Sequence, residues 1–315
     1  MPKKIIIDTD PGIDDAMAIF FAITSPELEL LGLTTTFGNV SVDTATANAL
    51  RLVEMSGQDI PVAQGAAQPW VQSLTDYPDF IHGHDGLGNV NLPPPAGTAI
   101  ELSAAQFIVK TVLENPHEVT LIAIGPLVNL ALALTLEPRI AQLVEKVVIM
   151  GGTILEPGNV SPVAEANIYC DPHAADKVFR ADWHVNMVGL DVTHKILMTD
   201  SLQERIRDQN PMCGQFLYKA GMFYADFYRK HRGADGCYVH DASAVAYTIN
   251  PDLFAVIEGP VRVATEGIAR GQTILQRTNY TFPEAHWENI TPSSVCMGVD
   301  SDAVTALYEK AMARM

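Results

Sequence analysis

The sequence predicts an α/β fold with an open, mostly parallel, doubly wound (Rossmann-like) sheet that carries helices on both faces. Two observations lead to this prediction. Short apolar runs alternate with segments of helical pattern from the start of the chain. The apolar runs are unbroken series of Val, Ile and Leu, which is typical of strands that are buried on both faces. Because no shift in composition marks a second domain, we expect residues 1–315 to form a single one.

The first two strand–helix units are the clearest. Ile5–Ile7 is predicted to be a buried strand, and the helical pattern of Asp14–Ile23 follows it directly. Leu30–Thr36 is the next predicted strand and Asp43–Met55 the next helix, with Asp43 as its N-cap. The segment that comes next, Gln64–Gly97, is long and rich in Pro, Gly and His, and it is predicted to be a loop. A loop of this length in a compact domain more often has a function than serves only as a connection.

The same alternation continues through the middle of the chain. Further strands are expected at Val119–Ile124, Val147–Met150 and Val185–Leu190. Helices are expected at Ser103–Leu113, Leu127–Leu136 and Pro172–Phe179. The last third departs from this pattern. We expect a mostly helical region at Asp200–Tyr247, strand-like runs at Phe254–Thr281 and a closing helix at Asp300–Met312.

Composition and charge narrow the class of protein. Hydrophobic residues make up 48% of the chain, which is enough for a large core, and the formal net charge is −17. A surface this acidic repels phosphate backbones, so we predict no nucleic-acid partner. The four cysteines form no CxxC pair, so the pattern indicates neither a zinc site nor disulfides. No apolar run is long enough for a signal peptide or a membrane span, and we therefore expect a cytoplasmic protein without a membrane partner.

The most informative segment is acidic. Asp8, Asp10, Asp14 and Asp15 lie within eight residues, between the first predicted strand and the first predicted helix. Capping of the helix N-terminus explains one or two of these acids, but it leaves the two that follow the strand unexplained. Clustered carboxylates repel each other unless a cation offsets them. Because no His or Cys is adjacent, we predict a hard cation, with calcium as the first choice and magnesium as the second.

Other polar groups follow the predicted strands at their carboxyl ends, where α/β sheets bind ligands. Such groups or glycines occur at Gly38-Asn39, Ile124-Gly125-Pro126, Met150-Gly151-Gly152 and Gly189-Leu190-Asp191. Two amides and a carboxylate (Asn159, Asn167 and Glu165) share one Pro-containing segment, which suits the recognition of hydroxyl groups but also suits an ordinary solvated loop.

Histidines and tyrosines give weaker signals. His82 lies in the long loop, and His240 precedes Asp241 at the start of a predicted helix. A single histidine is more often structural than catalytic, and Asp241 is equally suited to be an N-cap, so periodicity alone leaves this pair undecided. Tyr224 and Tyr228 are four residues apart on one helix face, where they suit either base stacking or core packing.

Taken together, these segments resemble a known family. The octapeptide Asp8-Thr9-Asp10-Pro11-Gly12-Ile13-Asp14-Asp15 is similar to the signature of the nucleoside hydrolases, including the inosine–uridine-preferring members. Seven further segments resemble family blocks in the family order: Phe37-Gly38-Asn39-Val40, His82-Gly83, Ile124-Gly125-Pro126-Leu127, Met150-Gly151-Gly152, Ala164-Glu165 with Asn167, Gly189-Leu190-Asp191-Val192-Thr193 and His240-Asp241. The ordered set is far more specific than the octapeptide alone.

The resemblance implies roles for these residues. One Ca²⁺ per subunit would be held by Asp10, Asp15, Asp241 and the backbone carbonyl of Ile124. Asp10 would also be the general base that takes a proton from a metal-bound water, and His240 would be the acid for the leaving group. The groups that bind the substrate would be Asp14, Asn39, Glu165 and Asn167 at the ribose hydroxyls, Asn159 and Met150 nearby, His82 as a base-stacking residue, and Tyr224 and Tyr228 at a purine or pyrimidine base.

The same resemblance implies the activity, which is hydrolysis of the N-glycosidic bond of purine and pyrimidine ribonucleosides, such as inosine and uridine, to free base and ribose. Such an enzyme would act in nucleoside catabolism and in purine and pyrimidine salvage, as a homodimer or homotetramer. One position departs from the family pattern. Ala166 stands where the family commonly has Phe, which would leave space near the ribose or its 5′ group and alter affinity or substrate preference.

Two other functions compete with this interpretation. Haloacid-dehalogenase-like phosphohydrolases also have an aspartate-rich segment after the first strand. In those enzymes a Thr or Ser follows the acidic pair, whereas here Pro11-Gly12 follows Asp10. The second alternative is a non-catalytic, calcium-dependent nucleoside-binding protein, which the presence of every proposed catalytic side chain disfavours.

Overall fold

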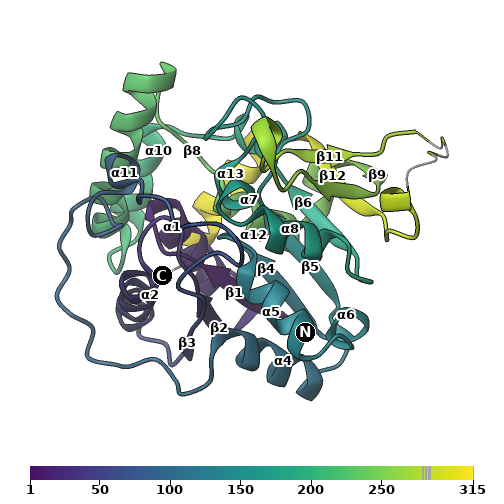
Figure 1. Ribbon diagram of the computed structural model, residues 1–315. Helices are drawn as coiled ribbons and strands as arrows, with labels where there is room; N and C mark the ends of the chain where they lie inside the picture. The colour runs from purple at the N-terminus through teal and green to yellow at the C-terminus, as the bar shows by residue number, and fades with distance from the viewer. Residues whose placement is uncertain (279, 281, 283–284, 315) are drawn as a thin grey trace.

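The computed structural model describes residues 1–278, 280, 282 and 285–314, and its centre is an eight-stranded sheet (Figure 1). The first seven strands in spatial order are parallel to their neighbours, and the eighth is antiparallel at the edge. In that order they are β3 (Val62–Gln64), β2 (Leu28–Thr35), β1 (Lys3–Thr9), β4 (Val119–Ala123), β5 (Lys146–Met150), β6 (Val185–Val188), β12 (Ser293–Val299) and β9 (Phe254–Gly259).

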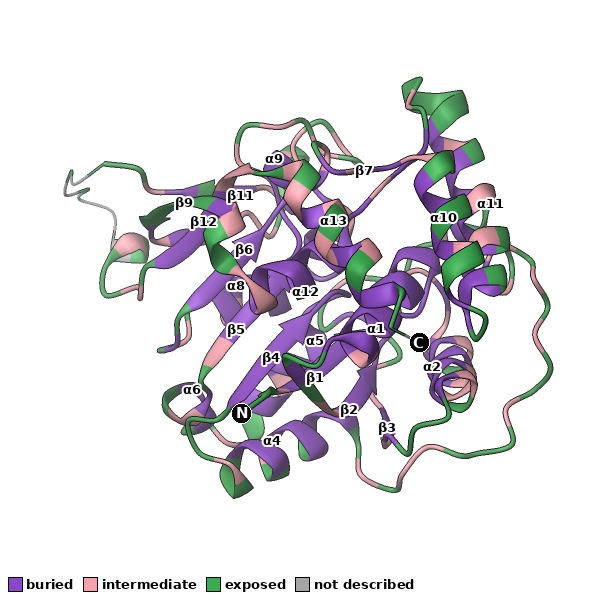
Figure 2. Cartoon of the chain, turned by 180° about the vertical axis from the view of Figure 1, so that it is seen from behind, coloured by how far each residue is buried: buried purple, intermediate pink, exposed green. Residues whose placement is uncertain are grey.

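Helices cover both faces of this sheet, as the sequence predicts. One face packs against α1 (Ile13–Thr24), α2 (Val42–Ser56), α12 (Asp241–Ile249) and α13 (Ser301–Met312). The other packs against α4 (Ala104–Glu114), α5 (Val128–Leu136), α6 (Ile140–Leu143) and α8 (Pro172–Phe179). Alternation along β1 divides its side chains between the two cores, with Ile5 and Ile7 on the α1 side and Ile6 on the α5 side. Figure 2 shows the strands buried between the two helix layers.

The remaining helices and two small sheets surround the carboxyl edge of the sheet. The helices are α3 (Asp79–His82), α7 (Ala166–Cys170), α9 (Leu190–Thr193), α10 (Asp200–Gln209) and α11 (Gly214–Arg232). One small sheet pairs β7 (Leu197–Met198) and β8 (Cys237–Tyr238), and the other pairs β10 (Val261–Val263) and β11 (Thr273–Leu275). Three short 3₁₀ helices complete the described elements, at Pro251–Leu253, Gly267–Ala269 and Ala285–Trp287. In Figure 1, α10 and α11 stand beside α1 at one end of the molecule, and β9, β11 and β12 lie at the other.

The predicted elements before residue 180 are present, with shifted ends, and the doubly wound architecture is confirmed. Three details are wrong. Ser41 rather than Asp43 caps α2, because its hydroxyl accepts the N–H of Thr44 at 3.3 Å. The β6 strand ends at Val188, and Leu190 opens α9 instead. The segment predicted to be a loop from Gln64 begins inside β3 and contains α3.

The last third also follows the prediction in outline. Residues 200–247 are mostly helical, and a helix closes the described chain. Strands β9, β10 and β11 occupy the region of strand-like runs, although its predicted end at Thr281 lies outside the described residues. The sequence does not predict β12, which forms much of the sheet beyond β6. Among the described residues, no helix is both long and apolar enough to cross a membrane.

Candidate functional site

Three buried carboxylates meet above the carboxyl ends of the parallel strands. Asp14, Asp15 and Asp241 each offer an oxygen, and these oxygens all lie within 4.8 Å of one another. Asp14 and Asp15 stand in the first turn of α1, and Asp241 stands in the first turn of α12. These two helices pack against each other, so residues that are more than two hundred positions apart reach one point. The positive helix N-termini favour negative charge there.

Asp10 follows β1 and lies beside this cluster, in a space that two glycines leave open. Its Oδ2 accepts the backbone N–H of Asn39 at 2.6 Å, and its Oδ1 is buried without a hydrogen-bond partner among the described residues. A Cβ at Gly38 would overlap Oδ2, and a Cβ at Gly125 would lie 2.5 Å from Oδ1. Glycines after β2 and β4 are therefore needed for the Asp10 carboxylate to sit where it does.

Asp15 is held rigidly by its neighbours. Its carboxylate accepts hydrogen bonds from the Thr9 hydroxyl at 2.5 Å, the Gly12 backbone N–H at 2.9 Å and the Asn39 side-chain amide at 2.9 Å. Asn39 thus contacts both Asp10 and Asp15. These bonds fix the directions of two carboxylates before any ligand arrives, which is the property that a preorganised site requires.

Without a cation, the buried carboxylates of the site repel each other. Burial raises the pKa of Asp14 to about 6, and burial together with the Asp14 charge raises the pKa of Asp15 to about 6. The pKa values of Asp10 and Asp241 lie well above the usual range, first because both are buried and then because neighbouring aspartates repel their charge. Asp14 Oδ1 and Asp10 Oδ1 also have no hydrogen-bond partner among the described residues. Buried oxygens that lack partners and crowd together suit a hard divalent cation.

The polar loop after β5 forms a second wall. Glu165 caps α7, since its carboxylate accepts the backbone N–H groups of Gly152, Asn167 and Ile168 at 2.9, 3.0 and 3.2 Å. The Asn167 amide donates to the carbonyls of Ile124 at 2.9 Å and Met150 at 3.2 Å. The structure therefore brings the predicted carbonyl ligand of Ile124 and the predicted ribose-binding residues together.

Asn159 is the outlier among the predicted site residues. Its side chain is exposed, and its Oδ1 accepts the backbone N–H of Ala166 at 3.0 Å. That bond ties the loop to the start of α7 and leaves the amide N–H₂ group of Asn159 available to a ligand.

A chain of hydrogen bonds runs from the acidic cluster to His240. The Tyr224 hydroxyl donates to Asp14 Oδ2 at 3.0 Å and lies 3.2 Å from the Tyr228 hydroxyl. The Tyr228 hydroxyl is 2.8 Å from His240 Nε2, and the hydroxyl of Thr193 is 2.8 Å from His240 Nδ1. All five side chains are buried. Burial lowers the pKa of His240 well below its usual range, so the ring is neutral when no ligand is bound.

His82 closes the site from the side of the long loop. Its Nδ1 accepts the backbone N–H of Ile13 at 3.3 Å, and its ring lies 5.4 Å from the ring of Tyr224. Burial lowers the pKa of His82 to about 4, although the Asp15 charge acts in the opposite direction. A neutral, buried ring beside a tyrosine has the flat apolar face on which a base can stack.

Two residues that support the site are given no role by the sequence, although Thr193 lies in the segment Gly189-Leu190-Asp191-Val192-Thr193 that resembles a family block. Asn129 donates to Asp8 Oδ1 at 2.8 Å and to the Thr35 carbonyl at 2.9 Å, which ties α5 to the ends of β1 and β2. Thr193 contacts His240 from α9. A polar residue in an apolar helix and a threonine near a strand end were the available signals, and neither is specific.

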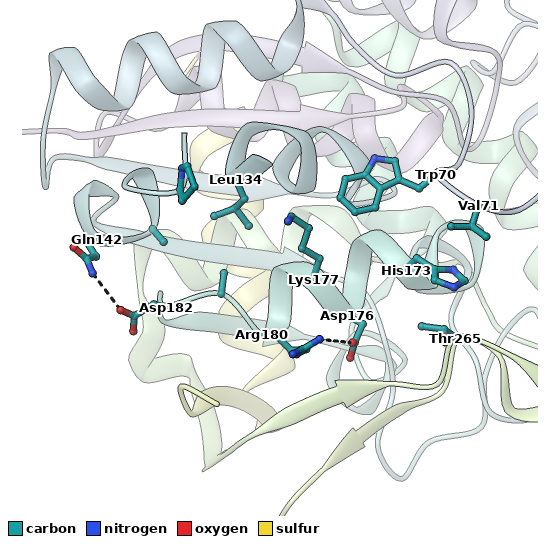
Figure 3. Close-up of a pocket in the computed structure, with 13 residues that line it drawn as sticks. Trp70, Val71, Leu134, Gln142, His173, Asp176, Lys177, Arg180, Asp182 and Thr265 are labelled. Atoms are coloured by element: carbon teal, nitrogen blue, oxygen red, sulfur yellow. Dashed lines mark hydrogen bonds and ion pairs between the residues drawn. The ribbon is translucent and has the colours of Figure 1, made fainter. Parts of the chain in front are cut away.

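One cavity lies away from the predicted site residues. It has a volume of about 790 Å³ and is lined by residues of α5, α6 and α8 together with Trp70, Val71 and Thr265 (Figure 3). Lys177 lies over the Trp70 ring at 5.6 Å, and Arg180 faces Asp176. None of the predicted site residues lines this cavity.

Comparisons with known proteins point to one family. Residues 5–306 match the family model described as inosine-uridine preferring nucleoside hydrolase. The chain is 44% identical over 308 residues to a probable uridine nucleosidase 2 of Arabidopsis thaliana, with 97% of this chain and 96% of the relative covered. It is 42% identical over 279 residues to an inosine-uridine preferring nucleoside hydrolase of Leishmania major, which covers 87% of this chain and 88% of the relative.

A solved structure of a plant nucleoside hydrolase superposes with a TM-score of 0.96 at 41% sequence identity, with 99% of each chain covered. A superposition with this coverage includes nearly the whole sheet and both helix layers. The chain therefore belongs to the inosine-uridine preferring nucleoside hydrolase family and is an N-glycosyl hydrolase.

Proposed function

We propose that this enzyme hydrolyses the N-glycosidic bond of both purine and pyrimidine ribonucleosides, such as inosine and uridine, to free base and ribose. The observation that carries the proposal is one continuous buried assembly. Carboxylates suited to a cation lie at one end, and a histidine with two tyrosines lies at the other. The names of the relatives from Arabidopsis thaliana and Leishmania major support the same substrate class.

The proposed cofactor is one Ca²⁺ per subunit, held by Asp10, Asp15, Asp241 and the carbonyl of Ile124. Metal dependence is a property of the family, and the acidic cluster provides oxygen ligands of the kind calcium prefers. Asp14 belongs to the same cluster of carboxylates, so it either joins the ligands or faces the ribose hydroxyls beside them. When bound, the cation would supply a positive charge that offsets the carboxylates, acidifies water and attracts the ribose hydroxyl groups.

The chain's own residues then perform the chemistry. Asp10 takes a proton from the water that attacks C1′ of the ribose. Asp14, Asn39, Glu165 and Asn167 position the ribose through its hydroxyls, with Asn159 and Met150 nearby. Positive charge that spreads over the ribose ring in the transition state is stabilised by the same buried carboxylates.

The leaving base needs a proton, because a purine or pyrimidine anion departs poorly. His240 is the proposed donor, and its hydrogen bond to Tyr228 connects it to Tyr224 and Asp14. His82, whose ring lies beside that of Tyr224, would stack on the base. Two tyrosine hydroxyls next to the acid provide polar partners for bases of different size, which supports broad base acceptance.

A reducing-sugar assay on uridine, inosine and cytidine tests this proposal. We expect the enzyme to release ribose from uridine and inosine, to lose this activity after chelation and to regain it when Ca²⁺ is returned. Binding of nucleoside without ribose release would instead support the non-catalytic alternative. A phosphate-release assay on phosphate esters covers the phosphohydrolase alternative, for which neither the fold comparison nor the site gives support.

Other parts of the prediction are independent of this assay. A homodimer or homotetramer, a cytoplasmic location, a role in nucleoside salvage and a single domain over residues 1–315 stay predictions. The residues assigned to the site all come from one chain. Sedimentation analysis of the purified protein measures the assembly directly.

A further inference from the structure

The short helix α9 has buried polar side chains that the proposed reaction does not use. It follows β6 at the carboxyl edge of the sheet and contains Asp191 and Thr193, which are 3% and 0% exposed. Each of these side chains reaches a different part of the site. We propose that α9 is a positioning element, in which Thr193 orients His240 and Asp191 fixes the loop on the ribose side. This inference rests on the proposed function.

Only one assignment of donors and acceptors satisfies all the hydrogen bonds around His240. Tyr224 donates its proton to Asp14, so its oxygen must accept from Tyr228 at the 3.2 Å contact. Tyr228 has then used its only proton, and its 2.8 Å contact with His240 requires Nε2 to donate. A neutral imidazole that carries its proton on Nε2 accepts at Nδ1.

Thr193 completes this chain. Its hydroxyl lies 2.8 Å from Nδ1 of His240 and is the group that donates there. The hydroxyl thereby fixes both the rotation of the imidazole ring and the nitrogen that carries the proton, so that the N–H of Nε2 faces the tyrosines. Because Thr193 touches neither the substrate nor the reacting atoms in this arrangement, its role is positioning rather than catalytic.

Asp191 acts on the opposite wall of the site. Its carboxylate accepts three consecutive backbone N–H groups, those of Ile154, Leu155 and Glu156, at 2.6, 2.7 and 3.0 Å. The hydroxyl of Thr153 also approaches it at 3.4 Å.

These amides belong to the loop that leaves β5 and returns at Glu165, with Asn159 between. The neighbouring His194 adds a contact from its Nδ1 to the Glu156 carboxylate at 3.3 Å. A buried carboxylate that satisfies three consecutive backbone donors ties this loop to α9 and thereby helps to set the geometry of the ribose side.

The two roles predict different kinetic defects, which a substrate that needs no leaving-group proton can separate. Nitrophenyl riboside releases a stable phenolate without protonation, whereas inosine needs the acid. Thr193→Val keeps the shape of the side chain but removes the hydroxyl. We expect this variant to lower kcat on inosine by about tenfold, and to change kcat on nitrophenyl riboside by less than about twofold. Thr193→Ser keeps the hydroxyl and should restore most of the activity on inosine.

Asp191→Asn should produce the opposite pattern. An amide can accept fewer of the loop donors, so the loop loosens and the ribose is bound less well whatever the leaving group. We expect KM to rise by about tenfold for inosine, uridine and nitrophenyl riboside alike, with faster hydrogen exchange at the amides of residues 154–156. Asp176→Asn is the matched control, because Asp176 is also a buried aspartate that accepts a backbone N–H, from Val263 at 3.0 Å, outside the site. That control should leave KM unchanged.

Two further readouts do not depend on turnover. The ¹⁵N shifts of the His240 ring should show the proton on Nε2 in the unaltered protein and a loss of this preference in Thr193→Val. Hydrogen exchange at the amides of residues 154–156 likewise measures how firmly the loop is held, without any turnover. Equal loss on all substrates in Thr193→Val with an unchanged ring spectrum would overturn the role of Thr193, and unchanged KM and exchange in Asp191→Asn would overturn that of Asp191. If the unaltered enzyme cleaved no riboside, the proposed function would fail, while the ring spectrum and the exchange rates would still decide the positioning roles.

Discussion

At the scale of single residues, the acidic cluster is where the sequence was most informative. The crowding of carboxylates after a buried strand singles out Asp10, Asp14 and Asp15. The structure groups Asp14 and Asp15 with Asp241, and Asp10 lies close enough to interact with this cluster. The contacts that orient them were not predictable. Asn129 and Thr193 act through side chains that meet only after α5 and α9 dock, and such pairings leave no spacing pattern in the sequence.

Asp10→Asn tests the base directly. The amide keeps the size of the side chain and can still accept the N–H of Asn39, but it does not take a proton from water. We expect kcat for uridine to fall by about 10²–10⁴-fold, which is the usual contribution of a general base. The circular dichroism spectrum should be unchanged. Near-normal turnover in this variant would show that another group activates the water.

Tyr228→Phe tests the connection between His240 and the tyrosines. The variant leaves Nε2 of His240 without its partner, and the effect should be greatest for a large base that extends toward Tyr224. We expect kcat/KM to fall by about tenfold for inosine and by about threefold at most for uridine. Tyr247→Phe is the matched control, since the Tyr247 hydroxyl donates to Asn186 at 2.8 Å in the core. Equal losses for both nucleosides in Tyr228→Phe would contradict the role in base acceptance.

At the scale of elements, hydrophobic periodicity predicted the central strands and the helices that cover them. These elements are apolar enough for pattern to determine their type. The short elements at the rim were missed or misassigned, as at α3, α7 and α9, because four or five residues carry too little periodicity. The strand β12 was missed because its Ser, Cys, Met and Gly residues lack the β-branched run of the others, and the sheet around it makes it a strand.

Gly125→Ala tests how the strand ends shape the site. The added methyl group would lie 2.5 Å from Asp10 Oδ1, and the carboxylate would have to move. Displacements of about 1 Å at a reacting group cost about 10²-fold, so we expect at least that loss in kcat.

Gly57→Ala is the contrasting control. Gly57 caps α2 at a φ of +68°, and nothing lies within 4 Å of its added methyl group. This variant should lose about 1 kcal/mol of stability through backbone strain and keep full activity. Loss of activity in Gly57→Ala, or its retention in Gly125→Ala, would argue against the packing of Asp10 between the strand ends.

At the scale of the whole molecule, the fold tolerates a buried set of repelling carboxylates, and this has a consequence for stability. Burial raises the pKa of Asp8 to about 7, and the pKa values of Asp10 and Asp241 lie well above their usual range. The acidic net charge of −17 adds to this repulsion. The fold class was predictable because it depends on the order of many apolar segments, whereas this strain depends on which few acids become neighbours.

Because of this repulsion, the stability of the metal-free protein should depend on pH. Above about pH 6.5 the unfolded chain has lost the protons of its carboxylates and half or more of those of its histidines. The native state still holds protons on carboxylates with raised pKa values, so native protein binds more protons and stability must fall as pH rises. We expect Tm of the chelated protein to drop between pH 6.5 and 8.

Calcium should remove this dependence, because the cation replaces the protons. A Ca²⁺ concentration a hundredfold above the Kd at pH 8 should raise Tm at that pH by roughly 5 °C. The same concentration should raise Tm by less at pH 6.5. Differential scanning calorimetry at both pH values measures the effect. An equal Tm shift at the two pH values, or stability that rises with pH in the chelated protein, would contradict the assigned pKa directions.

The most direct measurement of the central claim is a crystal structure of the enzyme grown with Ca²⁺, with the ion identified by its anomalous scattering. The account predicts one ion at the acidic cluster, about 2.3–2.6 Å from oxygens of Asp10, Asp15, Asp241 and the carbonyl of Ile124. Clear density for these four groups with no ion between them, or an ion bound elsewhere while uridine is still cleaved, would contradict it.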